Sequence, residues 1–267
     1  MNTIIISVIS VTVIGIICAI ALSAASKLMY VKVDERIANL QESLPGVNCG
    51  ACGYPGCAGY AAALLSGECK KTNLCTPGGP DVVLKISAIL GVTAEALEQK
   101  AAVVHCNGDF NAQQKKMNYF GIQSCAAAKQ LFGGESSCAF GCLSYGDCQI
   151  ACPSNAICMT SGLARVTPGL CTGCSLCVKA CPNNLIIMMD SRVPIIIACK
   201  NIEKGAVTRK KCSSGCIACG KCVRECPQTA ITLENNLAVI NYDKCNGCGN
   251  CIKTCATRCI TSPLIRI

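Results

Sequence analysis

The sequence predicts an α+β protein with one N-terminal transmembrane helix, a small helical cysteine module, a helical linker region and two cysteine-rich repeat units. Three observations lead to this prediction. The first 26 residues carry no charged side chain, the 28 cysteines of this 267-residue chain cluster in CxxC steps, and the C-terminal cysteine groups repeat. The expected divisions are 1–30 (anchor), 31–80 (module), 81–137 (helical linker), 138–190 (first repeat unit), 191–215 (inserted linker) and 216–267 (second repeat unit).

The N-terminal prediction rests on residues 4–25, an apolar run of 22 residues that is long enough to cross a bilayer as a helix. A cleaved signal peptide is the alternative, because residues 23–26 resemble a small-residue cleavage site, although no positive charge precedes the run. Lys27, Lys32 and Arg36 all follow it. The positive-inside rule then predicts a single-pass protein of the inner membrane with the bulk of the chain on the cytoplasmic side.

The cysteine pattern indicates reduced, ligand-binding thiolates rather than disulfides, which belong to short secreted chains. The chain has one histidine, His105, and no CxxC is followed by histidine. These facts exclude covalent haem, Rieske clusters and zinc fingers of the mixed Cys/His type. No glycine-rich nucleotide loop occurs, so neither flavin nor NAD is expected on this chain.

The formal charge of +9 does not indicate nucleic-acid binding. An oxidised [4Fe–4S] cluster with four thiolates carries a net charge of about −2, so several such clusters would offset the basic side chains. Aromatic residues, six Tyr and four Phe, are too few for base-stacking platforms. We expect no nucleic-acid partner.

The module at 31–80 is expected to bind one cluster. Cys49, Cys52, Cys57 and Cys75 follow a CxxCx4Cx17C pattern between glycines, and Cys69 is the alternative fourth ligand. Short helices are predicted at 33–44 and 58–65. In the linker that follows, residues 81–90 and 94–104 are predicted to be helical.

The C-terminal half contains an internal repeat. Four similar stretches, CPSNAI, CPNNLI, CPQTAI and CATRCI, begin at Cys152, Cys181, Cys226 and Cys255. The first two begin 29 residues apart, and so do the last two. CxxCxxCxxxCP, complete at residues 216–227, is the signature of bacterial ferredoxins, in which the fourth cysteine binds the neighbouring [4Fe–4S] cluster. The two units are therefore expected to be ferredoxin-like and to hold two clusters each.

This rule gives four ligand sets. They are Cys216, Cys219, Cys222 and Cys255; Cys245, Cys248, Cys251 and Cys226; Cys171, Cys174, Cys177 and Cys152; and, with stretched steps, Cys138, Cys142, Cys148 and Cys181. With the module this makes five clusters.

Other cysteines fall outside these sets. Cys259 stands where the other repeats have Ala156, Leu185 and Ala230, so we interpret it as a packing residue, like Cys158. Cys18 lies in the expected membrane helix, and four more remain in the body of the chain, which is the number a sixth cluster needs; the alternative is scattered buried thiols. They are Cys106, Cys125, Cys199 and Cys212.

The order of these elements resembles the B subunit of the Rnf complex. The resemblance rests on the N-terminal helix, NCGACGYPGC with a distant CTPGG, and the repeated ferredoxin units, and it covers nearly the whole chain. CAFGCLSYGDCQIACP and the stretch from Cys199 to Cys212 resemble the cluster-rich versions of that subunit.

The resemblance implies a subunit of an Na⁺- or H⁺-translocating ferredoxin:NAD⁺ oxidoreductase. Such a subunit takes electrons from ferredoxin and passes them to membrane partners, with NAD and flavin on other subunits. The module, next to the membrane helix, would be the exit cluster. Two alternatives are the iron–sulfur subunit of another membrane complex, such as a hydrogenase, and a non-redox zinc protein. A basic face for ferredoxin, or simply solvated charge, is formed by Lys221, Arg224, Arg209, Lys210 and Lys211.

Overall fold

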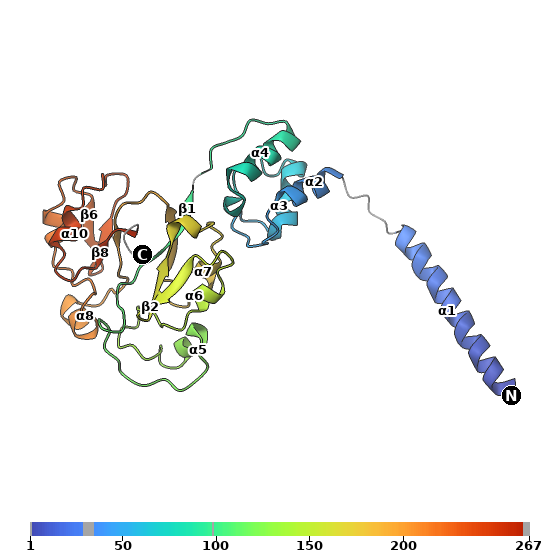
Figure 1. Cartoon of the computed structure of the whole chain (residues 1–267), viewed down its shortest axis with the longest axis horizontal. Helices are drawn as coiled ribbons and strands as arrows, with labels where there is room; N and C mark the ends of the chain where they lie inside the picture. The colour runs from blue at the N-terminus through green and yellow to red at the C-terminus, as the bar shows by residue number, and fades with distance from the viewer. Residues whose placement is uncertain (1, 29–34, 98, 264–267) are drawn as a thin grey trace.

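The structure is a computed structural model that describes residues 2–28, 35–97 and 99–263 (Figure 1). It contains a long N-terminal helix, a small helical module and a larger C-terminal part in which short helices and two-stranded sheets alternate. All 28 cysteines lie within the described ranges, and none of them forms a disulfide.

Helix α1 runs over Asn2–Leu28. The described residues nevertheless include no helix that is both long enough and apolar enough to cross a membrane. The expectation of a single-pass transmembrane anchor is therefore wrong. The expectation rested on the apolar run at residues 4–25, in which hydroxyl residues such as Thr12 and Ser23 occur, and Lys27 lies in the last turn of α1.

The module is built from α2 (Glu35–Ser43), α3 (Gly56–Ser66), the 3-10 turn η1 (Thr76–Gly78) and α4 (Gly79–Leu90). Leu40, Tyr60 and Ile86, one from each α-helix, are fully buried and form its core. Gly67 and Gly91 end α3 and α4 in the left-handed conformation that glycine adopts without strain. The predicted helices at 58–65 and 81–90 are confirmed, and the one at 33–44 is confirmed within 35–43.

The predicted helix at 94–104 is wrong. Lys100–Val104 is a strand, β1, which pairs antiparallel with β4 (Ile186–Asp190). Its Ala-Ala-Val-Val side chains are all buried, and the β-branched valines suit a strand. Long-range pairing therefore overrides local preference here. The rest of the expected helical linker is mostly irregular, and α5 (Cys125–Gln130) is a short exception.

The first repeat unit contains a ferredoxin-like pair of sheets. Its elements are α6 (Asp147–Ile150), β2 (Ile157–Thr160), β3 (Leu163–Val166), η2 (Pro168–Leu170), α7 (Leu176–Ala180) and β4. β2 pairs with β3, while β1 comes from the linker to pair with β4.

The second unit repeats this plan. Its elements are β5 (Ile196–Ile197), α8 (Gly205–Lys211), α9 (Lys221–Arg224), β6 (Ile231–Glu234), β7 (Leu237–Ile240), α10 (Asn250–Thr254) and β8 (Ile260–Thr261). β6 pairs with β7, and β5 pairs with β8. β5 is thus the counterpart of β1, since each unit is completed by a strand from the preceding linker.

Candidate metal centres

The module closes around a pocket lined by Cys49, Cys52, Cys57 and Cys75, which we call site 1. The Asn48 side-chain oxygen accepts the Cys57 N–H at 2.8 Å and fixes the loop at the start of α3. Cys69 does not line this pocket; its thiol donates to the Lys71 carbonyl instead. The geometry thus favours Cys75 over Cys69 as the fourth thiol of site 1.

Site 2 is the set Cys152, Cys171, Cys174 and Cys177 of the first unit. Burial, and then the negative charge of the other three thiols, raise the pKa of Cys177 to about 12, which reflects how closely the set is gathered. The Ala156 N–H donates to the Cys152 sulfur at 3.3 Å. The structure therefore brings this predicted set together.

In the second unit, site 5 is a pocket lined by Cys216, Cys219, Cys222 and Cys255, as the sequence predicts. Site 6 is the set Cys226, Cys245, Cys248 and Cys251. Burial and the neighbouring Cys245 and Cys248 raise the pKa of Cys251 to about 11. Cys226 packs in the same core as Cys245 and Cys251 and accepts the Ala230 N–H at 3.3 Å.

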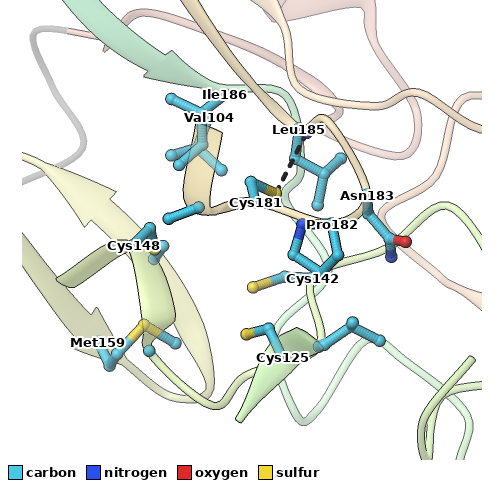
Figure 2. A pocket seen from close by; sticks show the side chains of 14 residues that line it. Val104, Cys125, Cys142, Cys148, Met159, Cys181, Pro182, Asn183, Leu185 and Ile186 are labelled. Atoms are coloured by element: carbon cyan, nitrogen blue, oxygen red, sulfur yellow. Dashed lines mark hydrogen bonds between the residues drawn. The ribbon is translucent and has the colours of Figure 1, made fainter. Parts of the chain in front are cut away.

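The remaining set of the first unit differs from the prediction. The pocket here, site 3, is lined by Cys142, Cys148, Cys181 and Cys125, not Cys138. In Figure 2, Cys125 and Cys142 turn their sulfur atoms into the space they share with Cys148, and Leu185 N–H donates to the Cys181 sulfur at 3.4 Å. The grouping of Cys138 with the other three is therefore wrong.

The repeat explains the error. CLSYGDCQIACP, from Cys142, aligns without a gap on CIACGKCVRECP, from Cys216. Cys142 is therefore the first cysteine of its motif, and the second position is occupied by Tyr145. Cys125, at the start of α5, supplies the missing thiol from outside the motif. This ungapped alignment is the signal that the stretched spacing from Cys138 concealed.

Asp147 holds Cys125 in place and has no counterpart in the sequence prediction. Its carboxylate accepts the N–H groups of Cys125 and Ala126 at 2.9 and 3.0 Å and the Ser124 hydroxyl at 2.9 Å. Burial opposes ionisation, but these donors outweigh it and lower the pKa of Asp147. Because Asp147 directly precedes Cys148, it connects the two segments that line site 3.

Cys138 lies instead in a second pocket, site 4, together with Cys106, Cys199 and Cys212. The Asn201 amide, almost fully buried, donates to the Cys138 sulfur at 3.6 Å. Three of the four residues expected at a sixth site are thus brought together, and Cys138 takes the place expected for Cys125.

Site 4 follows the symmetry of the two units. Cys106 comes two residues after β1, and Cys199 two residues after its counterpart β5. Cys138 and Cys212 each precede by four residues the first cysteine of a motif. An isolated antiparallel β-bridge between Gln113 and Cys212 joins the segment that follows β1 to the segment that precedes the motif of the second unit. Each unit therefore contributes an equivalent pair of thiols to a pocket between them.

The six sites form one series, in which hydrogen bonds join three neighbouring pairs and shared units join the other two. Lys179, in α7 beside site 2, donates to the Cys49 carbonyl of site 1 at 2.9 Å. Sites 2 and 3 share the first unit. Asn183, on the wall of site 3, donates to the carbonyl of Gly141, on the wall of site 4, at 2.6 Å. The Cys216 N–H of site 5 donates to the Cys199 sulfur of site 4 at 3.3 Å, and sites 5 and 6 share the second unit.

These pockets suit a cluster better than a single ion. Among the described residues no three Cys, His, Asp or Glu side chains lie close enough to hold one metal ion. A [4Fe–4S] cluster instead binds each thiolate to a different iron, and N–H groups commonly donate to those sulfurs. Burial raises the pKa of Cys106 and of Cys148 to about 12, so these thiols need a bound metal to ionise near neutral pH. The residues therefore fit the group.

Comparisons with known proteins agree with this chemistry. Residues 44–77 match the FeS family, an Fe-S cluster family. Residues 170–231 and 208–256 match two families described as 4Fe-4S dicluster domains.

Relatives identify the family. Over 98% of its length the chain is 38% identical to the B subunit of the Na⁺-translocating ferredoxin:NAD⁺ oxidoreductase complex of Acetobacterium woodii, covering 78% of that protein. It is 37% identical, over 92% of its length and 87% of the relative's, to the B subunit of the proton-translocating ferredoxin:NAD⁺ oxidoreductase complex of Clostridium ljungdahlii. The chain belongs to the family of Rnf B subunits.

As a member of the family of Rnf B subunits, the chain is an iron–sulfur electron-transfer component of an enzyme complex. A third relative, the B subunit of the ion-translocating oxidoreductase complex of Methanosarcina acetivorans, is 33% identical over 86% of this chain and 88% of its own. The family separates this protein from the two alternatives that the sequence left open, a hydrogenase component and a zinc protein.

Proposed function

We propose that this chain accepts electrons from reduced ferredoxin and conducts them through six [4Fe–4S] clusters to other subunits of its complex. The observation that supports this most directly is the series of neighbouring sites from site 6 to site 1, joined by hydrogen bonds and shared units. When bound, each cluster takes up and releases one electron. The ligands of the series are the twenty-four cysteines of sites 1 to 6.

The chain's own contribution is to hold the sites next to each other and to exclude water from them. Site 4 is the critical position, because its pocket lies between the two ferredoxin-like units. Its four thiols are all buried. Two come from each unit, so the folding of the pocket also fixes the units relative to each other.

We place the ferredoxin end at sites 5 and 6. Cys219 and Cys248 are exposed, whereas the cysteines of sites 3 and 4 are buried or half-buried. Lys221 and Arg224 are exposed on α9, beside Cys222. An acidic electron carrier could therefore approach these thiols closely, guided by opposite charge. The names of the relatives, ferredoxin:NAD⁺ oxidoreductases, support ferredoxin as this carrier.

Site 1 is then the exit, since it lies at the opposite end of the series. Its cysteines Cys49, Cys52 and Cys57 are half-buried, which leaves the site approachable by a partner protein. Association with the membrane would come through the other subunits of the complex, and NAD and flavin would be bound there.

The test uses the full chain prepared without oxygen. We expect about 24 iron and about 24 acid-labile sulfide per chain, four for each of six clusters. Reduced ferredoxin should then bleach the visible absorption of the protein by more than the reduction of a single cluster would. About 20 iron would contradict a cluster at site 4, and failure of reduced ferredoxin to reduce the loaded protein would contradict the proposed donor.

A further inference from the structure

A fifth cysteine lies at site 5. Cys259 lines the same pocket as Cys216, Cys219, Cys222 and Cys255. Its sulfur is 3.6 Å from that of Cys255, within hydrogen-bonding distance for sulfur. Cys259 is only 2% exposed, so water does not compete for its proton. The interpretation of Cys259 as a packing residue is therefore incomplete.

The other repeats show what Cys259 adds. The residue four positions after the last cysteine of a motif donates its backbone N–H to that cysteine: Ala156 to Cys152, Leu185 to Cys181, and Ala230 to Cys226, at 3.3 to 3.4 Å. None of these three side chains can donate a hydrogen bond. Cys259 occupies the same position beside Cys255, and its side chain adds a second donor.

The direction of this hydrogen bond follows from the chemistry of the ligands. Thiolates that bind iron carry no proton and can only accept, so the proton must lie on Cys259. A donor to the ligand sulfurs stabilises the more negative, reduced state of a cluster.

We propose that Cys259 is a positioning residue whose thiol donates to the Cys255 ligand of site 5 and makes this cluster easier to reduce than its partner at site 6. Cys259 keeps its proton throughout, so the reduction transfers one electron and no proton. The inference rests on the proposed function, because it requires a cluster at site 5. It predicts that the clusters of sites 5 and 6 differ in midpoint potential, although both are held by the same cysteine motif.

The experiment is a potentiometric titration of the full-length, cluster-loaded chain followed by electron paramagnetic resonance. Cys259→Ala should lower the midpoint potential of the site 5 signal, changing the electron-exchange equilibrium with site 6 about tenfold, which corresponds to about 59 mV for one electron. Cys259→Ser retains a donor and should restore most of the potential. Ala230→Cys is the matched control at site 6 and should raise the potential of that cluster.

The outcomes separate this inference from the function on which it rests. Cys222→Ala identifies the site 5 signal by removing it, together with about four iron. Unchanged iron in Cys222→Ala would overturn the cluster at site 5 itself. If that cluster is present but Cys259→Ala leaves its potential unchanged, only the inference on Cys259 is overturned. Loss of about four iron in both Cys259→Ala and Cys259→Ser would also overturn it, because the residue would then be needed to hold the cluster.

Discussion

The Thr76 hydroxyl donates a hydrogen bond of 3.0 Å to the Gly173 carbonyl, 97 residues away along the chain. Thr76 directly follows Cys75 of site 1, and Gly173 lies between Cys171 and Cys174 of site 2. A bond therefore joins the cysteine loop of the module to that of the first unit. With the contact between Lys179 and the Cys49 carbonyl, it holds the module at the end of the series.

Thr76→Val should weaken this docking without removing a ligand. Loss of the bond costs about 0.5–1.5 kcal/mol, which lowers the docking equilibrium constant by a factor of roughly 2 to 13. We expect unchanged iron content and slower electron delivery to site 1, measured by rapid-freeze electron paramagnetic resonance. Thr232→Val is the control, since the Thr232 hydroxyl is bonded only to Glu234 on an exposed strand. Equal rates in both variants would contradict the docking role of Thr76.

Double variants distinguish the ligand sets of sites 3 and 4. Cys125→Ala with Cys142→Ala should lose about four iron, because both residues belong to one cluster. Cys138→Ala with Cys142→Ala should lose about eight, because they belong to two. Iron analysis of the full chain is the measurement. Loss of about eight iron in the first double variant and about four in the second would instead support the sequence-based grouping of Cys138 with Cys142.

Asp147→Asn should release Cys125 from site 3. The amide keeps one oxygen but loses the charge, and a capping contact of this kind contributes about 0.5–2 kcal/mol. We expect a more rapid loss of about four iron to a chelator, with the remaining clusters retained. Asp190→Asn removes a carboxylate that pairs with Arg192 on the surface, and it should behave as wild type. Equal iron loss in the two variants would argue against the role of Asp147.

The basic residues of α9 should guide ferredoxin. Lys221→Gln with Arg224→Gln is expected to slow reduction by ferredoxin severalfold at low ionic strength, and the difference should vanish at high salt because screening removes steering. Stopped-flow bleaching measures the rate. Lys70→Gln with Lys71→Gln makes the same charge change in the module, where both side chains are exposed, and should have no effect. Lys211 is unsuited to docking, since it pairs with Glu203 at 2.5 Å.

The structure gathers the cysteine sets predicted from the sequence where their members are close in the sequence. Sites 1, 2, 5 and 6 follow from short cysteine spacings, and three of them also from the rule that the fourth cysteine crosses to the neighbouring cluster. Site 3 was mispredicted because its second ligand position is Tyr145, and the replacement, Cys125, lies outside the motif. A spacing argument does not contain the hydrogen bonds from Cys125 to Asp147 that decide the matter.

The other errors have the same origin. Lys100–Val104 was expected to be helical because its pairing with Ile186–Asp190 is invisible locally. Site 4 requires that β1 and β5 be recognised as equivalent, and both lie in segments treated as linkers. The membrane anchor was predicted from the apolar run at residues 4–25, whereas the described residues include no helix that could span a membrane.

The most direct test of the proposed electron path concerns site 4 as the link between the two units. Cys212→Ala should lower the iron of the full chain by about four and leave the other five clusters in place. After mixing with reduced ferredoxin, rapid-freeze electron paramagnetic resonance should show prompt reduction at sites 5 and 6 and strongly delayed reduction at sites 1 to 3. Reduction of sites 1 to 3 at the wild-type rate in this variant would contradict the proposed series.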